Sequence, residues 1–267
     1  HLRAMAMRTS GVLMHISSLP GNTGIGTLGI EAYKFIDFLK KSGQTYWQVL
    51  PLCPTSYGDS PYQSFSTFAG NPYFIDFDLL YKGGLLKKND YSSVNWGENQ
   101  EKVDFQTIYK NRFKVLRKAY TNFDLTDKSY LDFCDKNTYW LDDFALYMTL
   151  KDSFDGKPWN EWEKVLKTRK STVIEKVKKE LKNEIEFQKF IQYEFFVQWS
   201  NLKKYANENG ILIIGDIPIY VAGDSADVWA NPKNFLLDED CNPIEVAGCP
   251  PDAFTEDGQL WGNPLYD

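Results

Sequence analysis

Histidine is nearly absent from this sequence of 267 residues. One of its two histidines, His1, falls in residues 1–6 (HLRAMA), a segment typical of vector-derived sequence ahead of a native start at Met7. His15 is then the one native histidine. Most serine and cysteine hydrolases need a histidine base, and zinc sites built from histidine need two or three of them. The composition argues against both kinds of site.

Paired cysteines and long apolar runs are also missing. The four cysteines, Cys53, Cys134, Cys241 and Cys249, include no C-x-x-C pair, so we expect reduced thiols rather than a zinc ribbon or a disulfide framework. No apolar run approaches the roughly 18 residues of a membrane span, and the N-terminus has no signal-peptide apolar stretch. These absences predict a soluble, cytoplasmic protein without a membrane partner.

Basic charge is in deficit. The 30 Lys and Arg residues are outnumbered by 36 Asp and Glu, which gives a net charge of −6. Binding to nucleic acid requires clustered positive charge, so we expect no nucleic-acid partner and favour a neutral or cationic ligand. Carboxylates and aromatics remain for building a site. The aromatic fraction of 16%, with eight Trp and sixteen Tyr, suits core packing and also stacking on the apolar faces of sugar rings.

Strand-like and helix-like patterns alternate along the chain. Short apolar runs predict strands at residues 11–16, 45–50 and 211–221. Helical spacing of apolar residues predicts helices at 30–41 and 186–209. Near-continuous apolar strands are typical of a parallel sheet that is covered on both faces.

This order predicts an α/β fold, a (β/α)8 TIM barrel with a mainly helical inserted subdomain. We expect residues 7–80 to form the first barrel units, 81–185 the helical insertion, and 186–267 a further barrel unit with a long active-site loop. A full barrel needs eight units, whereas this sequence offers three or four, so we expect the barrel to be incomplete in this chain. In such barrels the loops after the strands form the active-site face.

One glycine-rich segment suggests a different class of protein. Gly24–Gly29 (GIGTLG) matches the G-x-G-x-x-G fingerprint of dinucleotide-binding folds. However, Gly24 lies eight residues beyond the predicted strand with Pro20 between, and the second strand ends in Leu50-Pro51 without an acid to bind a ribose. We interpret the segment as a loop that enters a helix, with a nucleotide-dependent oxidoreductase as the alternative.

The segment Ser60–Pro72 (SPYQSFSTFAGNP) mixes hydroxyls, an amide and aromatics without periodicity. It is either a binding surface or a structural turn packed by its phenylalanines. As a binding surface, Tyr62 would stack on a sugar while Ser60 and Gln63 bind its hydroxyls.

Two later segments also carry candidate residues. Asp216, in GDIPIYV, ends a predicted strand and is either a loop-anchoring carboxylate or a ligand group. The Gly- and Pro-rich stretch that contains Trp261 (AGCPPDAFTEDGQLWGNPLYD) is typical of a long functional lid.

Four motifs taken together resemble the 4-alpha-glucanotransferase family (amylomaltase or disproportionating enzyme). They are SSLPG at 17–21, SPYQSFSTFAGNP at 60–72, GDIPIYVAGDSADVWANP at 215–232 and PPDAFTEDGQLWGNPLYD at 250–267. The resemblance runs from about Arg8 to the last residue, with only general character shared in the middle insertion. It implies a β/α barrel with inserted subdomains, and retaining transfer of alpha-1,4-glucan segments to the 4-hydroxyl of another glucan or of glucose. It implies neither a cofactor nor a metal.

The resemblance also implies roles for individual residues. Tyr62 matches a tyrosine that stacks at the donor side of the cleavage point, Asp216 an acid that contacts the transferred glucose, and Trp261 a loop tryptophan that covers bound glucan. Ser60 and Gln63 are expected near the sugar. The family's nucleophilic aspartate lies in an R-x-D-H type motif, which does not occur in this sequence. We therefore expect no catalytic residue in this chain, and no activity from it alone.

Two other functions fit the same residues. An alpha-glucan hydrolase of the amylase type would differ only in giving the glycosyl intermediate to water. A noncatalytic glucan-binding fragment would keep the aromatic loops without turnover. The oligomeric state is not indicated by the sequence.

Overall fold

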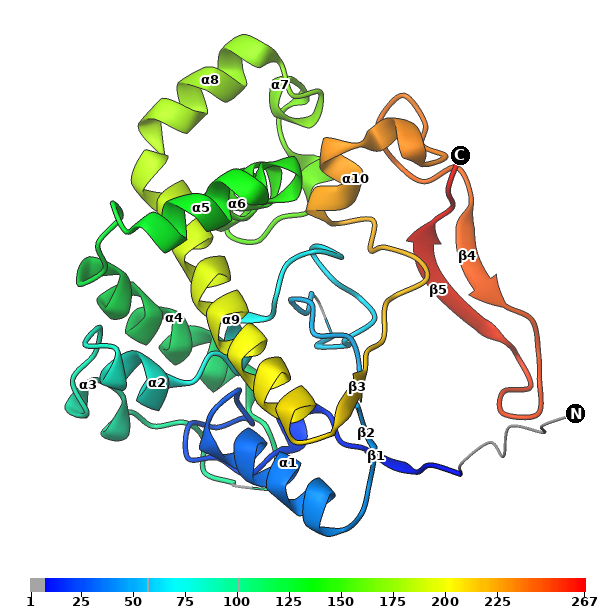
Figure 1. The fold of residues 1–267 in the computed structure, drawn as a ribbon. Coiled ribbons are helices and arrows are strands. Elements are labelled where there is room, and N and C mark those ends of the chain that lie inside the picture. The colour runs from blue at the N-terminus through cyan, green and yellow to red at the C-terminus, as the bar shows by residue number, and fades with distance from the viewer. Residues whose placement is uncertain (1–7, 57, 100) are drawn as a thin grey trace, which may run out of the picture. The chain divides into compact units, whose positions relative to one another are not determined.

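The computed structural model describes residues 8–267 except residues 57 and 100, so the segment interpreted as vector-derived (1–6) lies outside the described residues. The chain forms an α/β fold (Figure 1). It divides into two compact units that alternate along the sequence. Unit 1 comprises the chain up to residue 52 together with residues 72–123 and 194–216. Unit 2 comprises residues 53–71, 124–193 and 217–267.

Unit 1 contains a parallel sheet of three strands in the order β1-β2-β3. They are β1 (Gly11–Leu13), β2 (Tyr46–Gln48) and β3 (Leu212–Ile214). Each lies within a predicted strand, so those three predictions are confirmed, although the strands are shorter. The run 211–221 leaves the sheet after Ile214, where Gly215 and Pro218 follow; glycine weakens a strand and proline cannot donate to a ladder.

The expectation that both faces of this sheet are buried is wrong for the described residues. Val12, Trp47 and Ile213 are paired across the three strands, and Trp47 is fully buried. Its ring contacts Phe35 of α1 (Ile30–Lys41) edge-on at 5.1 Å between centroids. Because side chains alternate between faces, the opposite face carries Leu212, which is 49% exposed. The apolar run thus reflects a sheet that unit 1 covers on one side.

Both predicted helices are present. α1 spans Ile30–Lys41 as expected, with its apolar side packed inward and Gly43 in a left-handed conformation (φ +70°) just after it. The predicted helix at 186–209 corresponds to α9 (Lys182–Glu208), which contributes residues to both units. Gly210 (φ +75°) follows it and lets Ile211 N–H donate back to the Ala206 carbonyl, turning the chain into β3.

Helices and 3-10 turns make up the regular elements of the described residues between β2 and α9. They are η2 (Pro72–Phe74), α2 (Phe77–Lys82), α3 (Asn89–Ser92), α4 (Phe105–Thr121), α5 (Lys128–Lys136), α6 (Thr138–Ser153), η3 (Trp159–Glu161), α7 (Lys164–Lys167) and α8 (Ser171–Glu180). None of the helices in the described part of the chain combines the length and apolarity that crossing a membrane requires.

Unit 2 ends in an antiparallel hairpin. After α10 (Ala226–Ala230) and η4 (Pro232–Asn234), strands β4 (Val246–Cys249) and β5 (Gln259–Pro264) pair with an irregularity between Val246 and Gly248. Figure 1 shows this hairpin extending away from the helices of its unit. The long lid expected around Trp261 is thus in part a β-ribbon.

The glycines of the 24–29 segment are explained by close packing in unit 1. A Cβ on Gly26 would lie 1.8 Å from the Ile16 carbonyl oxygen, and one on Gly29 would lie 2.1 Å from Asp76 Oδ2. Gly29 is also the N-cap of α1, so the Asp76 carboxylate lies at that helix N-terminus. These contacts support the interpretation of the segment as a loop that enters a helix.

A buried arginine ties this loop to the rest of unit 1. The Arg112 guanidinium is fully buried and donates to the carbonyls of Thr23 (3.2 Å) and Ile75. It also lies over the ring of Phe77 at 4.2 Å and near that of Trp96. Since a buried charge is costly without partners, these carbonyls and rings hold the guanidinium in place.

We predict that His15 makes unit 1 sensitive to acid. Its ring packs edge-on against Phe74, and burial lowers the pKa of His15 to about 4 from the usual 6.5. The unfolded chain therefore binds a proton at this residue that the folded chain does not, and stability falls as the pH drops from 6.5 toward 4. We expect a loss of about 2 kcal/mol, after allowing for partial solvent exposure of the ring.

The measurement is the urea midpoint of wild type and of His15→Gln at pH 7.0 and pH 4.5. The wild type should lose more stability than the variant over this range. Equal losses would show that acid sensitivity comes from the carboxylates instead.

Candidate functional site

The loop that contains Ser60, Tyr62 and Gln63 belongs to unit 2 and is shaped by buried serines. Ser64 Oγ donates to the Pro54 carbonyl at 2.7 Å, and Ser66 Oγ accepts from the backbone N–H of Phe68 at 3.1 Å. Both serines are buried. Such local bonds satisfy backbone groups that cannot join a ladder, so they fix an irregular loop in one conformation.

Two helical side chains hold the same loop from outside. Gln192 of α9 is fully buried; its amide accepts from Gly70 N–H at 2.7 Å and donates to the Gly70 carbonyl at 3.0 Å. Asp227 of α10 accepts from the N–H and the hydroxyl of Thr67 at 2.9 and 3.2 Å. Burial raises the pKa of Asp227. These bonds show that part of the Ser60–Pro72 loop has a structural role, which was one of the two interpretations of its sequence.

The side chains of Tyr62 and Trp261 are accessible to solvent. Each is 43% exposed. The Tyr62 N–H donates to Ser60 Oγ at 3.3 Å, which places Ser60 beneath the turn that presents the tyrosine. The Trp261 indole donates from Nε1 to Gln259 Oε1 at 3.0 Å, and its ring lies 6.2 Å from that of Tyr220. Half-exposed aromatic rings can stack on the apolar face of a sugar.

Gln63 and Trp261, far apart in sequence, are brought together by the structure. Gln63 Nε2 donates to the Trp261 carbonyl at 3.4 Å and to Asn263 Oδ1 at 2.9 Å, and Asn263 Nδ2 donates back to Gln63 Oε1 at 3.3 Å. Asn263 was not among the residues predicted from sequence. The sequence feature that could have indicated it is the residue type, because asparagine is depleted in strands and a buried amide needs hydrogen-bond partners.

Asp216 belongs to unit 1. It lies two residues beyond β3 with its side chain exposed, at the carboxyl end of a parallel strand. That strand-end position was predicted from sequence and is confirmed. Ligand-binding residues in parallel α/β folds are found at this end of the strands.

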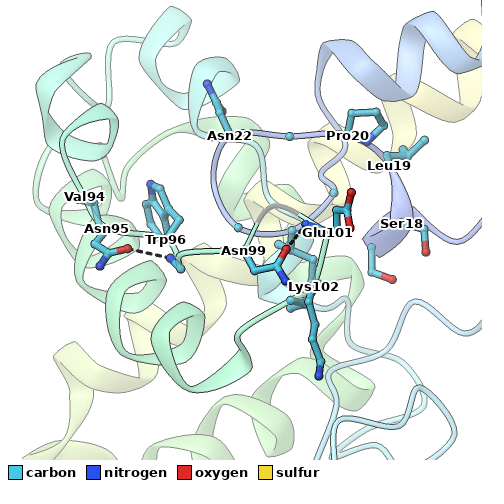
Figure 2. A pocket seen from close by; sticks show the side chains of 17 residues that line it. Ser18, Leu19, Pro20, Asn22, Val94, Asn95, Trp96, Asn99, Glu101 and Lys102 are labelled. Atoms are coloured by element: carbon cyan, nitrogen blue, oxygen red, sulfur yellow. Dashed lines mark hydrogen bonds between the residues drawn. The ribbon is translucent and has the colours of Figure 1, made fainter.

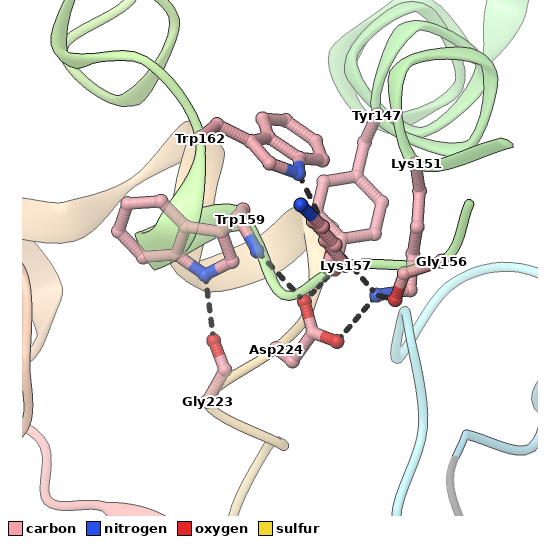
Figure 3. A network of polar contacts seen from close by, with 8 residues as sticks. All are labelled: Tyr147, Lys151, Gly156, Lys157, Trp159, Trp162, Gly223 and Asp224. Carbon is pink, nitrogen blue, oxygen red and sulfur yellow. Dashed lines mark hydrogen bonds and ion pairs between the residues drawn. The ribbon is translucent and has the colours of Figure 1, made fainter. Parts of the chain in front are cut away.

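A second cluster missed from sequence surrounds Asp224 in unit 2 (Figure 3). Its carboxylate accepts from the Tyr147 hydroxyl at 2.6 Å, from Trp159 N–H at 3.2 Å and from the Lys151 ammonium. Lys151 also donates to the Gly156 carbonyl at 2.9 Å. Burial, and then the Asp224 charge, raise the pKa of Tyr147, so this hydroxyl stays a donor. The cluster fixes the segment around Asp224 against α6.

Unit 1 contains a cavity of about 700 Å³ between residues 17–26 and 94–103 (Figure 2). Serine, asparagine and backbone groups line it, and Asn95 and Asn99 accept from the N–H groups of Gly97 and Glu101. Trp96, the one aromatic among the described residues that line it, is only 8% exposed, so it offers no ring face for stacking.

Metal ligands are not gathered anywhere in the described residues: no three His, Cys, Asp or Glu side chains there could hold an ion together.

The fold and these loops define an α/β protein with a parallel sheet and half-exposed aromatics on rigid loops. The model of the 4-alpha-glucanotransferase family matches residues 14–267, and the chain belongs to this family. The resemblance seen in the four sequence motifs is thereby confirmed.

Individual relatives agree. The chain is 59% identical over 256 residues to a 4-alpha-glucanotransferase of Clostridium butyricum, covering 95% of this chain and 53% of the relative. It is 50% identical over 266 residues to one of Streptococcus pneumoniae serotype 4, covering 98% of this chain and 53% of the relative. The chain thus spans about half the length of the curated relatives it matches.

Solved structures show the same fold. An amylomaltase from Streptococcus agalactiae, in complex with acarbose, superposes with a TM-score of 0.94 at 47% identity, over 98% of this chain and 53% of that one. An amylomaltase from Corynebacterium glutamicum gives 0.73 at 17% identity, over 97% of this chain and 36% of that one; it shows likeness of fold alone.

We predict that Asp224→Asn destabilises the full-length protein by about 3 kcal/mol, because it leaves the Lys151 charge, 7% exposed, without its counterion. A matched control is Asp132→Asn, which breaks an ion pair with Lys136 whose side chains are 61% and 71% exposed; it should cost about 0.5 kcal/mol or less. Urea unfolding of both variants tests this. Equal losses of stability in the two variants would show that the Asp224 cluster does not stabilise the fold more than an exposed ion pair does.

Proposed function

We propose that the full-length protein is a 4-alpha-glucanotransferase, which transfers alpha-1,4-glucan segments to the 4-hydroxyl of an acceptor glucan or of glucose. The observation that carries this is the family match over residues 14–267. The exposed aromatics Tyr62 and Trp261 support it, because they offer the stacking faces that a glucan needs.

The reaction would follow a retaining double displacement. A carboxylate attacks the anomeric carbon while a carboxylic acid protonates the leaving glycosidic oxygen, which forms a covalent glycosyl-enzyme. The 4-hydroxyl of an acceptor then attacks the same carbon, gives its proton to the second carboxylate and releases the first. One alpha-1,4 bond breaks and one forms, so neither a redox partner nor net water is consumed.

The residues of this chain would serve the glucan rather than the bond-breaking step. We propose that Tyr62 stacks on the donor side, Asp216 contacts the glucose being transferred and Trp261 covers bound glucan. Ser60 and Gln63 would lie near the sugar. The nucleophile and the acid would come from sequence outside this chain, since the R-x-D-H type motif is absent from it.

We further propose that β1, β2 and β3 are strands of a (β/α)8 barrel. What supports this is the parallel order, the helix α1 between β1 and β2, and one exposed apolar face that includes Leu13 and Ile214. In this proposal residues 7–80 and 186–267 belong to the barrel with its long loop, and 81–185 form the inserted subdomain. The acidic composition and the four cysteines without a C-x-x-C pair favour a cytoplasmic protein that binds glucans and not nucleic acid.

Incubation with maltotriose tests the function. The full-length protein should produce glucose together with maltooligosaccharides longer than maltotriose, followed by chromatography. The 267-residue chain alone should produce neither. Glucose and maltose without longer products would indicate a hydrolase, and an unchanged substrate would favour a binding protein.

We predict that Trp261→Ala in the full-length protein lowers the ratio of transfer to hydrolysis about tenfold, because the ring helps to hold the acceptor and exclude water. Tyr81→Ala, which removes an aromatic of similar exposure (47%) on α2, is the matched control and should keep the ratio. The products from maltotriose give both ratios. An unchanged ratio in Trp261→Ala would show that the indole does not contribute to the choice between transfer and hydrolysis.

A further inference from the structure

We propose that Asn263 is a positioning residue for glucan transfer, which holds Trp261 in the arrangement that favours an acceptor sugar over water. This inference rests on the proposed function. It concerns a residue that sequence analysis did not single out and that cannot itself reach the glucan, since only 3% of its surface is exposed.

The amide of Asn263 joins three segments of unit 2. Its Oδ1 accepts from Gln63 of the Tyr62 loop at 2.9 Å. Its Nδ2 donates to the Val221 carbonyl at 2.9 Å, in the segment that follows Asp216 in sequence, and to Gln63 Oε1 at 3.3 Å. The third segment is β5, which carries Asn263 itself. Both the donor and the acceptor side of the amide are therefore used.

The exposure of β5 changes between Trp261 and Asn263. In β5 the residues from Gln259 to Gly262 are exposed, and burial begins at Asn263. Gly262, between Trp261 and Asn263, has a positive φ of +76° and so bends the strand at this point. Asn263 is therefore the first buried residue of β5 after Trp261, with the bend at Gly262 between them.

The same amide also fixes the ring that supports Trp261. Tyr220 lies 6.2 Å from the Trp261 ring and 5.8 Å from that of Tyr266, with which it stacks. Its carbonyl lies 3.5 Å from Asn263 Nδ2, and the neighbouring Val221 carbonyl accepts the shorter bond. The backbone of Tyr220 and the strand of Trp261 are therefore held by one side chain.

Asn263→Asp tests the proposal with almost no change of shape. A carboxylate cannot donate, so the bonds to the Val221 carbonyl and to Gln63 Oε1 are lost and replaced by oxygen–oxygen repulsion. We expect the ratio of transfer to hydrolysis on maltotriose to fall about tenfold, as for Trp261→Ala. This ratio does not depend on how much of the protein is folded, so a general loss of stability would leave it unchanged.

The double variant shows whether Asn263 acts through Trp261. In the Trp261→Ala background, Asn263→Asp should lower the ratio by no further factor, because the group it positions is already gone. Independent, multiplied effects would overturn the proposal, as would an unchanged ratio in Asn263→Asp alone.

Two further variants keep the test decisive. Asn160→Asp removes a comparable amide pair in unit 2, in which Asn160 donates to Asn242 at 3.0 Å, and should keep the wild-type ratio. If Asn263→Asp does not fold, Asn263→Ala removes the same bonds to Gln63 and to the Val221 carbonyl without adding a charge. Its effect on the ratio should then vanish in the Trp261→Ala background, and an effect that persists there would overturn the proposal.

The wild-type protein separates the two levels of inference. If wild type makes no product longer than maltotriose, the proposed function fails. If wild type makes the ladder and Asn263→Asp makes it in the same proportion to hydrolysis, the function stands and the positioning role of Asn263 is overturned.

Discussion

The structure depends on satisfying the backbone polar groups of long irregular segments. The strands of the described residues are short, so N–H and C=O groups in the loops after β2 and β3 are not paired by a sheet. Buried polar side chains take that role. Gln192 binds both backbone groups of Gly70 in unit 2, and Gln198 binds both of Asp76 in unit 1. Each side-chain amide makes the two backbone hydrogen bonds that a neighbouring strand would otherwise provide.

This arrangement gives loops that are rigid in the backbone and accessible at selected rings. In unit 2 the serines and Asp227 hold the Tyr62 loop, while Tyr62 itself is half exposed. In the proposed reaction, water would have to be kept from a covalent intermediate until an acceptor arrives, and a surface held in one conformation would serve that requirement better than a mobile one. The buried polar side chains therefore fix the loop backbone that presents the exposed aromatic rings.

The sequence predicted the regular elements well and their surroundings poorly. α1 and the three strands follow from local periodicity and from glycine or proline at their ends, which act within a few residues. The expected burial of both sheet faces was wrong for the described residues, because an apolar run reports what its residues can bury and not what covers them in this chain. Tyr62, Gln63 and Trp261 were singled out by motif, whereas Asn263, Lys151 and Asp224 were not.

By itself, then, the sequence determined the α/β pattern, the family and the aromatic candidates, since periodicity and motifs are local properties of the chain. Tertiary structure alone decided that Gln63 meets Trp261 and Asn263, about two hundred residues away, and that Lys151 neutralises Asp224. The physical reason is that the residue type of an amide or an ammonium does not indicate which distant residue it will bind. Hydrogen bonds and ion pairs at such separations are chosen only when folding brings the two groups together and removes the water between them.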